Sequence, residues 1–373
     1  MTRMPIRPDD EELTIKTGGK TLGGWLSLRV MRGVERLPSG FMCQLTERYP
    51  GQAAQVAVEP GATCQVFLGS DLIITGYIDK YQPAYSGTAH TVMLMGRSKT
   101  EDVVDSSVDT EALSEATGGT WEVKAGTIGD AAKLLCKPLH IDVSLPDGDV
   151  PLEPTYPFIV NPGMTVYQLL EEMARSVQVL MWDDPQGRLV LSKVGTKRAA
   201  TPLVEGINVE IAAAQYSMDQ RYHEIRVLGQ VGQLSPTRPG IHENYFGSAL
   251  DPDVRDGRLL VMIMDQVGID GAWPQKRANW EIGRRYGRSR QIQVTVTGWR
   301  GSDGQLWTPN TIVSVKCPTL KMNQDLVISE AAWMRSEQGT QTVLTLMPAK
   351  GLMPAPFLFT AAIPALAGGA TSA

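Results

Sequence analysis

The feature that most constrains this chain is a short pattern that occurs near both of its ends. The first copy is "VEPGATCQVFL" at 58–68 and the second is "LWTPNTIVSV" at 306–315. In each copy a proline fixes its own φ and the next residue, Gly61 or Asn310, tolerates a left-handed conformation, so the pair favours a tight turn. Apolar and polar residues then alternate, which is the period of a half-buried strand. Each copy therefore predicts a turn that leads into a strand.

Two further matches follow this turn in the same order. An Asp-Leu pair opens "DLIITGYID" at 71–79 and "DLVISEAAW" at 325–333, and a Gly-Thr pair opens "GTAHTVMLM" at 87–95 and "GTQTVLTLM" at 339–347. The distance from Pro to Asp is 11 residues in one copy and 16 in the other, and from Asp to Gly it is 16 and 14. Three matches in one order predict two copies of one β unit, and coincidence between two ordinary β regions is the alternative.

The first copy belongs to a longer β region. Period-2 alternation at 26–30 and again at 41–45 flanks an expected turn at Leu37-Pro38-Ser39-Gly40. Several short strands up to about Arg97 predict a small antiparallel barrel or sandwich.

The centre of the chain has helical periodicity instead. Segment 127–139 predicts a short helix that stops at Pro138, and 161–177 predicts a longer one with a capping box formed by Thr165 and Gln168. A hairpin across the turn 183–187 follows. Strands return from about Leu203, at 222–230 and 290–299, with a helical stretch near 273–287 between them.

These patterns predict a mainly β chain with α+β insertions, in which two tandem antiparallel β-barrels are each followed or interrupted by an inserted domain. The expected boundaries are 1–102 for the first barrel, 103–202 for an α+β insertion domain, 203–230 with 289–349 for the second barrel, 231–288 for a second insertion domain and 350–373 for a flexible C-terminal tail.

Composition narrows the function. The 35 Lys and Arg residues against 40 Asp and Glu give a net charge of −5, which argues against a protein built to grip nucleic acid, because gripping requires a positive surface. Four separated cysteines without a CxxC argue against a disulfide framework or a zinc site and fit a reducing cytoplasm. The polar N-terminus and the proline-interrupted apolar tract at 351–373 predict no membrane insertion.

No group of residues predicts a catalytic, cofactor-binding or metal-binding site. "GGKT" at 18–21 lacks the upstream glycine of a phosphate-binding loop and suits a hairpin turn. The carboxylate pairs are flanked by turn residues and are interpreted as turn-forming: Asp183-Asp184, Asp251/Asp253 and Glu101-Asp102. The histidines share no metal-ligand spacing: His90, His140, His223 and His242.

The densest basic cluster lies in and after the expected helix near 273–287. It comprises Lys276, Arg277, Arg284, Arg285, Arg288 and Arg290. The favoured interpretation is a charged face that docks an acidic partner or is merely solvated, with nucleic-acid contact as the other interpretation. Segment 101–115 is its acidic counterpart.

Two segments carry a resemblance to a known family. "GWRGSDGQLWTPNTIVSVKCPTLKMNQDLVISEAAWMRSEQGTQTVLTLMP" (298–348) resembles the C-terminal barrel of baseplate hub proteins from Mu-like contractile-tailed bacteriophages. "GYIDKYQPAYSGTAHTVMLMGRSKTEDVVDSS" (76–107) is similar to the end of that family's first barrel and its exit. The motif G-x-L-W-x-P-N with the following Gly-Thr strand is the distinctive part.

This resemblance implies a structural, non-enzymatic protein of the virion tail baseplate, assembled in the host bacterial cytoplasm, with two tube-protein-like barrels per chain. It implies a homotrimer whose six barrels adapt a sixfold tail tube to a trimeric central spike and form part of the DNA ejection channel, so that DNA only passes through. Tail-tube or tube-initiator proteins, other baseplate or wedge proteins and the tape-measure protein are the other implied partners.

Two other functions stay open at this point. A tail-associated cell-wall hydrolase would need a cleft with a carboxyl group of raised pKa. A glycan- or receptor-binding module would need exposed aromatic side chains on one face, for which Trp273, Trp280 and Tyr286 are the candidates.

Overall fold

Strands from both ends of the chain form one 14-stranded sheet in the computed structural model, which describes residues 12–46, 58–86, 90–152, 158–234, 242–267, 272–337 and 339–356. The N-terminal half of this sheet consists of β1 (Leu13–Thr17), β2 (Lys20–Leu22), β3 (Ser27–Gly33), β4 (Arg36–Thr46), β5 (Thr63–Leu68), β6 (Asp71–Tyr85) and β7 (His90–Ser98). The C-terminal half consists of β13 (Lys197–Arg198), β14 (Leu203–Val204), β15 (Val209–Tyr216), β19 (Arg290–Thr297), β20 (Thr311–Cys317), β21 (Met322–Ser336) and β22 (Gly339–Met347).

The two halves share one strand order. It is β1-β5-β6-β7-β4-β3 in the first half and β14-β20-β21-β22-β19-β15 in the second, although β14 runs parallel to β20 while β1 is antiparallel to β5. Even a one-residue bulge recurs, because the register of β6 on β7 shifts after Ile78 and that of β21 on β22 shifts after Ile328. The repeated sequence patterns therefore lie on corresponding strands.

One of the three sequence matches is out of structural register. Asp71 opens β6 opposite Leu68, whereas Asp325 lies inside β21 opposite Ser314. The second copy has a 3-10 helix (Pro318–Leu320, η2) before β21, which begins three residues ahead of Asp325. Gly87 and Thr88 of the third match lie outside the described residues.

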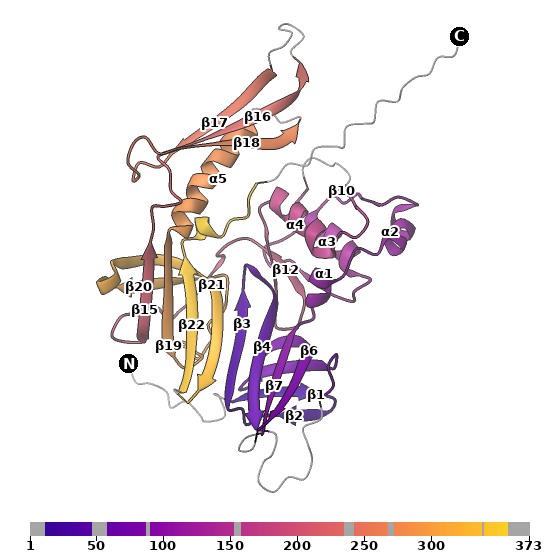
Figure 1. The fold of residues 1–373 in the computed structure, drawn as a ribbon, viewed down its shortest axis with the longest axis vertical. Helices are drawn as coiled ribbons and strands as arrows, with labels where there is room; N and C mark the ends of the chain where they lie inside the picture. The colour runs from indigo at the N-terminus through magenta and orange to yellow at the C-terminus, as the bar shows by residue number, and fades with distance from the viewer. Residues whose placement is uncertain are drawn as a thin grey trace.

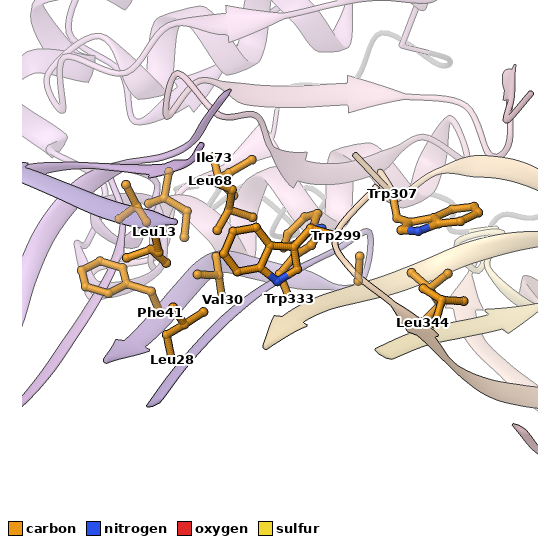
Figure 2. Packing of buried hydrophobic residues seen from close by; sticks show 14 of the residues in the cluster. Leu13, Leu28, Val30, Phe41, Leu68, Ile73, Trp299, Trp307, Trp333 and Leu344 are labelled. Carbon is orange, nitrogen blue, oxygen red and sulfur yellow. The ribbon is translucent and has the colours of Figure 1, made fainter. Parts of the chain in front are cut away.

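The halves do not stand as two separate barrels, because β3 pairs antiparallel with β21 and joins them into one sheet, as Figure 1 shows. Their buried side chains form one continuous core. In Figure 2, Trp333 and Trp299 lie between aliphatic side chains of the first half, such as Val30 and Leu68, and those of the second. Closure of either half into a barrel is not observed in the described residues.

The segment after β7 forms an α+β unit with its own core. Its helices are α1 (Glu101–Asp105), α2 (Thr110–Thr117), α3 (Ile128–Cys136) and α4 (Val166–Ser176), and its strands are β8 (Glu122–Val123), β9 (Val143–Ser144), β10 (Phe158–Ile159), β11 (Leu180–Asp183) and β12 (Leu189–Ser192). The predicted capping box is confirmed, since Thr165 and Gln168 bond each other's backbone N–H at the start of α4.

A second unit lies between β15 and β19. It contains a three-stranded sheet of β16 (Glu224–Leu234), β17 (His242–Leu250) and β18 (Leu259–Val267), and helix α5 (Ala272–Arg288). Ile225 and Val227 of the sheet pack on Ala278 of α5. The strand expected at 222–230 in the second barrel is β16, so it pairs with β17 and β18 and not with the large sheet.

The structure corrects the turn expected at 37–40 and describes only part of the expected C-terminal tail. The turn expected at 37–40 is part of β4, and the chain instead reverses between Gly33 and Arg36, where β3 pairs with β4. The expected tail at 350–373 begins inside a 3-10 helix, η3 (Ala349–Gly351), and its residues 357–373 lie outside the described part. No helix among the described residues has the length and apolar character needed to cross a membrane.

Asn310 adopts the left-handed conformation that the sequence predicts, with φ 61°. Its side chain also links the first inserted unit to the second half of the sheet. The Oδ1 atom accepts from the Gly195 N–H at 2.7 Å, and Nδ2 donates to the Lys193 carbonyl at 2.8 Å and to Ser192 Oγ at 3.2 Å.

Asn310→Ala should lower the free energy of unfolding by about 3 kcal/mol, because it removes three hydrogen bonds and because alanine adopts positive φ less readily than asparagine does. Asn310→Gly should cost about 1 kcal/mol less, because glycine accepts this φ. Urea unfolding of both variants measures the difference. Equal midpoints for the alanine and glycine variants would show that the backbone conformation contributes nothing.

Candidate assembly site

The phosphate-loop-like segment is a hairpin turn, as its composition suggests. Gly18 and Gly19 connect β1 to β2 with φ values of 53° and 74°. Residues with positive φ at a two-residue connection are what such hairpins require.

The histidines lie in separate parts of the chain. His90 and His242 open β7 and β17. The His223 ring has Nδ1 3.0 Å from the Val254 carbonyl and Nε2 3.2 Å from Asp256, and the His140 carbonyl accepts from Lys99 Nζ at 2.7 Å. In the described part of the chain no three metal-ligating side chains gather in one place.

The acidic pairs have three different roles. Asp184 forms a turn as predicted, since its Oδ1 accepts from the Gln186 and Arg188 N–H groups at 3.0 Å each. Asp251 also forms the predicted turn, since its Oδ1 accepts from the Asp253 N–H at 3.2 Å, and it is buried and binds the buried Arg221 through two hydrogen bonds of 2.9 and 2.8 Å. These are structural contacts and not a pair of carboxyl groups facing each other across a cleft.

Asp183 does not form the turn that the sequence predicts. It is 1% exposed and accepts from the Ser39 N–H at 3.0 Å, from Ser39 Oγ at 2.5 Å and from Thr100 Oγ1 at 3.3 Å. The buried Arg32 donates to its carbonyl at 2.8 Å, and burial lowers the pKa of this guanidinium, opposed by the nearby Asp183 charge. Asp183 thus joins β11 to β3 and β4.

Glu101 and Asp102 lie in the first turn of α1, so the turn interpretation of this pair is also wrong. Arg97 Nε lies 2.7 Å from Asp79 and 3.1 Å from Glu101. Burial, followed by the nearby Asp79 charge, raises the pKa of Glu101 to about 7. The group connects the bulge of β6 to α1, and its member Arg97 lines an open cavity of about 610 Å³ together with Arg36 and Glu330.

The basic residues of α5 mostly bind groups of this same chain, which corrects the expectation of a solvated or partner-docking face. Arg277 and Arg285 lie 2.8 and 3.1 Å from Glu281, and Arg288 pairs with Glu35 of the β3–β4 turn. Arg288 and Arg284 also donate to the Gly351 carbonyl after β22. Helix α5 is thereby fixed to both halves of the sheet.

The candidate glycan-binding aromatics are used in the same way. Trp280 donates to the Met353 carbonyl at 2.9 Å and stacks under Arg277 and Arg284, and Tyr286 lies under Arg221 and Arg290. Lys276 lies over Trp273. These contacts favour intramolecular packing over an open aromatic platform.

Open strand edges are among the surfaces that remain for assembly, as is the face of the β16–β18 sheet turned away from α5, where Phe246, Leu250 and Ile263 are exposed. Strand β15 ends one side of the sheet, and β19 is its one strand neighbour in the described residues, apart from a single bridge between Val209 and Glu205; Ile211 is 64% exposed. Strand β6 pairs with β5 only up to Tyr77, so its C-terminal part from Lys80 has a described strand neighbour, β7, on one side alone. Open edges of this kind are templates for another strand. Sequence alternation could not reveal them, because it is the same at an edge and in the interior.

Comparison with known families gives three matches along the chain. Residues 12–98 match the model "Mu phage baseplate assembly protein GpP-like, N-terminal", residues 100–193 match "Baseplate hub protein gp44-like, second domain", and residues 271–355 match "Mu phage baseplate assembly protein GpP, fourth domain". The second of these covers the α+β unit, for which the sequence motifs alone did not indicate a family.

Full-length comparisons agree. Baseplate hub protein gp44 of Escherichia phage Mu is 27% identical over an alignment of 348 residues that covers 91% of this chain and 89% of that protein. The 43 kDa tail protein of prophage MuSo2 from Shewanella oneidensis has a TM-score of 0.80 at 26% identity, covering 93% of this chain and all of that one. A tail protein from Neisseria meningitidis MC58 has the same fold, with a TM-score of 0.75 at 22% identity over 93% and 99% of the two chains. The resemblance to baseplate hub proteins of Mu-like phages is confirmed.

Proposed function

We propose that this chain, a relative of the Mu baseplate hub proteins, is a structural component of a phage tail baseplate. Three copies form a ring that joins a sixfold tail tube to a threefold spike and surrounds the DNA path. Its proposed neighbours are tube or tube-initiator proteins, the spike, wedge proteins and the tape-measure protein. The domain boundaries predicted from sequence are kept, except that β16 goes with the second inserted unit.

The observation that carries this proposal is the joint between β3 and β21. The two halves have equivalent strands, so β3 corresponds to β15 and β21 corresponds to β6. The joint uses one half's β3 and the other half's β21, and it leaves β15 and the end of β6 open. The same joint can therefore form between chains, with β15 of one chain against β6 of the next.

The register of this second joint follows from the first. The residue before the bulge in each half is an isoleucine, and its partners can be followed from strand to strand. In the first half, Ile78 pairs with Gly96, Gly96 with Phe41 and Phe41 with Val30. In the second half, Ile328 pairs with Leu346, Leu346 with Ile292 and Ile292 with Ala214. Val30 therefore corresponds to Ala214. Trp333, which pairs with Val30, lies five residues after Ile328. Pro83 lies five residues after Ile78 and is therefore the residue equivalent to Trp333.

The intermolecular pairs are thus Pro83 with Ala214, Gln82 with Gln215 and Ala84 with Ala213. Proline is tolerated on an edge strand, where it removes at most one donor. Pro83 and Ala214 bury less apolar surface than Trp333 and Val30 do, so the joint between chains is weaker than the joint within one. We therefore expect a trimer that dissociates at low concentration.

Closure of such joints gives a ring of suitable size. The eight-strand array β15-β19-β22-β21-β3-β4-β7-β6 occurs once per chain. Three arrays would supply about twenty-four strands, which at ~4.8 Å spacing form a ring about 37 Å across between backbones. Such a ring leaves an open centre even after side chains are added.

The ends of the array differ in a way that suits an adaptor. The inserted units and the C-terminal segment all leave from one end of the array, the end with the turn between β3 and β4. The first unit follows β7, the second lies between β15 and β19, and the C-terminal segment follows β22. Figure 1 shows the helices and the three-stranded sheet on that side. The opposite end carries the two equivalent hairpins β6–β7 and β21–β22. A trimer would present six such hairpins at one end and three sets of insertions at the other.

A disulfide test checks both the ring and its register. In the double variant Gln82→Cys and Gln215→Cys, the paired Cα atoms fall within the range that a disulfide spans. Under mild oxidation we expect covalent dimers and then trimers, without larger species, because the ring closes at three. All four native cysteines are buried, so they should not compete.

Two matched variants complete this test. Met31→Cys with Ala332→Cys places the same chemistry in the internal joint and should yield a cross-linked monomer. Gln82→Cys with Ala214→Cys is one residue out of register, with side chains on opposite faces, and should remain uncross-linked. Efficient cross-linking of the shifted pair, or an open series of oligomers from the proposed pair, would contradict the ring.

A further inference from the structure

We propose that one identifiable face of the eight-strand array lines the channel of this ring, and that the lining presents passing DNA with mostly amide, hydroxyl and thioether groups and with few uncompensated charges. The proposal rests on the proposed ring and goes beyond it, because it assigns the lining residues and their chemistry.

The two faces of the array differ in what covers them. Leu28, Val30, Phe41 and Leu344 point into the core, which strands β5 and β20 cover from the other side. Stacked sheets lie about 10 Å apart, so a second layer placed inside a ring about 37 Å across would nearly fill it. The covered face therefore lies outward in the ring. The opposite face, which no strand of the described chain covers, lies inward.

Cross-strand pairing shows what this inner face contains. One row around the ring runs from Gln341 through Met334, Arg29, Met42 and Met95 to Lys80. The row above it runs from Thr295 through Val343, Ala332, Met31 and Gly40 to Arg97. Gln44 and Met93 are paired below, next to Gln82. Most of the lining side chains are thus neutral, and methionines are frequent on β3, β4 and β7.

The charges on this face are few and mostly compensated. Arg97 is paired with Asp79, Glu101 and Asp105, and Glu330 is paired with Arg36 at 2.9 Å. Glu210 accepts from Gln341 at 2.9 Å and from Thr297. Arg29 and Lys80 are exposed, and neither forms an ion pair within the described residues. They lie in the same row as Gln341, so the unpaired cations and Glu210 occupy one level of the channel.

This arrangement has a direct consequence for DNA. Affinity for duplex DNA grows with the number of phosphates that cations neutralise, and so does its salt dependence. A lining with two cations per chain at one level, partly offset by Glu210, offers DNA few fixed contacts along the path. Methionine side chains are flexible and form no strong hydrogen bonds, so they add contact without fixed positions. DNA can then move through the ring without being held.

The test adds cations to the lining of a ring that is already closed by the Gln82→Cys and Gln215→Cys disulfide. The variant carries Gln44→Lys on β4 and Gln293→Lys on β19, one in each half, so that six lysines face the channel. The probes are a short blunt-ended linear duplex and a covalently closed circular DNA, which cannot thread a closed ring. Binding is measured by fluorescence anisotropy or filter retention between 50 and 200 mM salt.

We expect the ring without lysines to bind both probes weakly and to lose no more than about fortyfold in affinity for the linear duplex across this salt range, because three Glu210 carboxylates offset part of its six unpaired cations. The lysine ring should bind the linear duplex more tightly, lose about a thousandfold more affinity than the ring without lysines across this salt range, and bind the circle no better than before. A control ring with Thr63→Lys and Gln65→Lys on the outer strand β5 carries the same added charge and should gain no more than tenfold for either probe.

Equal gains for linear and circular DNA would place the face outside and overturn the assignment. Tight, steeply salt-dependent binding of linear DNA by the ring without lysines would overturn the lining with few uncompensated charges. Failure of the disulfide to close a trimer is a separate result, because it would reject the ring itself before DNA is added.

Discussion

A chain carrying Asp183→Ala is expected to lose about 3–5 kcal/mol of its free energy of unfolding, because the change leaves a buried cation without its compensating charge. Arg32 is 3% exposed and lies with its guanidinium at the Asp183 carbonyl. The same substitution leaves the Ser39 N–H, which donates to the carboxylate at 3.0 Å, without its acceptor. Urea unfolding followed by circular dichroism measures the loss.

Two further variants separate the stranded charge from simple loss of a contact. Arg32→Met combined with Asp183→Ala should recover part of the stability, since no unpaired charge remains. Glu330→Ala breaks an ion pair between two partly exposed side chains, Arg36 at 41% and Glu330 at 30%. It should lower the free energy of unfolding by less than about 1 kcal/mol. An Asp183→Ala variant within 1 kcal/mol of the parent chain would refute the buried-pair account.

The size of this effect follows from where the pair lies. Arg32 belongs to β3, Ser39 to β4, Asp183 to β11, and Thr100 immediately precedes α1. One carboxylate therefore connects the first half of the sheet to both the entrance and the final hairpin of the first inserted unit. Loss of these bonds should loosen the inserted unit as well as destabilise the chain.

Local chemistry made several parts of this fold predictable. The capping box at Thr165 and Gln168, the glycine turn at 18–19 and the left-handed Asn310 each depend on a few neighbouring residues. The duplicated β unit was visible for a similar reason, because turn residues recur before corresponding strands. In all these cases the residues that carry the signal also form the structure.

Pairing between distant strands was not predictable in the same way. The alternation at 222–230 correctly indicates a strand, but the same alternation fits β16 in either sheet. Likewise, the Asp-Leu pairs look equivalent in sequence, yet Asp325 lies inside β21 because the loops before the two strands differ. Strand partners depend on burial and register across the whole chain, which a single pattern does not contain.

The candidate site shows the same limit. Turn residues around Asp183 and Asp184 suggested one role for both, but Asp183 is the last residue of β11 and bonds Ser39 of β4, whereas Asp184 follows the strand and forms the turn. The arginines of α5 suggested an outer charged face, but they bind groups of the same chain. Glu35 and the Gly351 carbonyl are far from these arginines in the sequence, and Glu281 is a neighbour on the same helix. The open edges of β15 and β6 became visible only once the other strands were placed.

Trp333→Ala should reduce the free energy of unfolding by about 3–5 kcal/mol, because it leaves a cavity where the two halves of the sheet meet. The side chain is 1% exposed and packs in the core that continues from one half into the other (Figure 2). Since β21 pairs with β3 at this residue, the loss should also separate the unfolding of the two halves. Calorimetry of the parent chain and the variant compares the number and width of the transitions.

Trp121→Ala is the matched control, because this substitution removes the same atoms from a residue that is 46% exposed and lies outside the sheet. It should lower the free energy of unfolding by less than about 1 kcal/mol. In the proposed ring the equivalent position is Pro83, so Trp333→Ala gives the internal joint a small partner like the one in the joint between chains. The variant should then have two weak joints where the parent chain has one. If it unfolds in a single transition at the parent midpoint, the β3–β21 joint does not couple the halves, and the model for assembly built on that joint loses its basis.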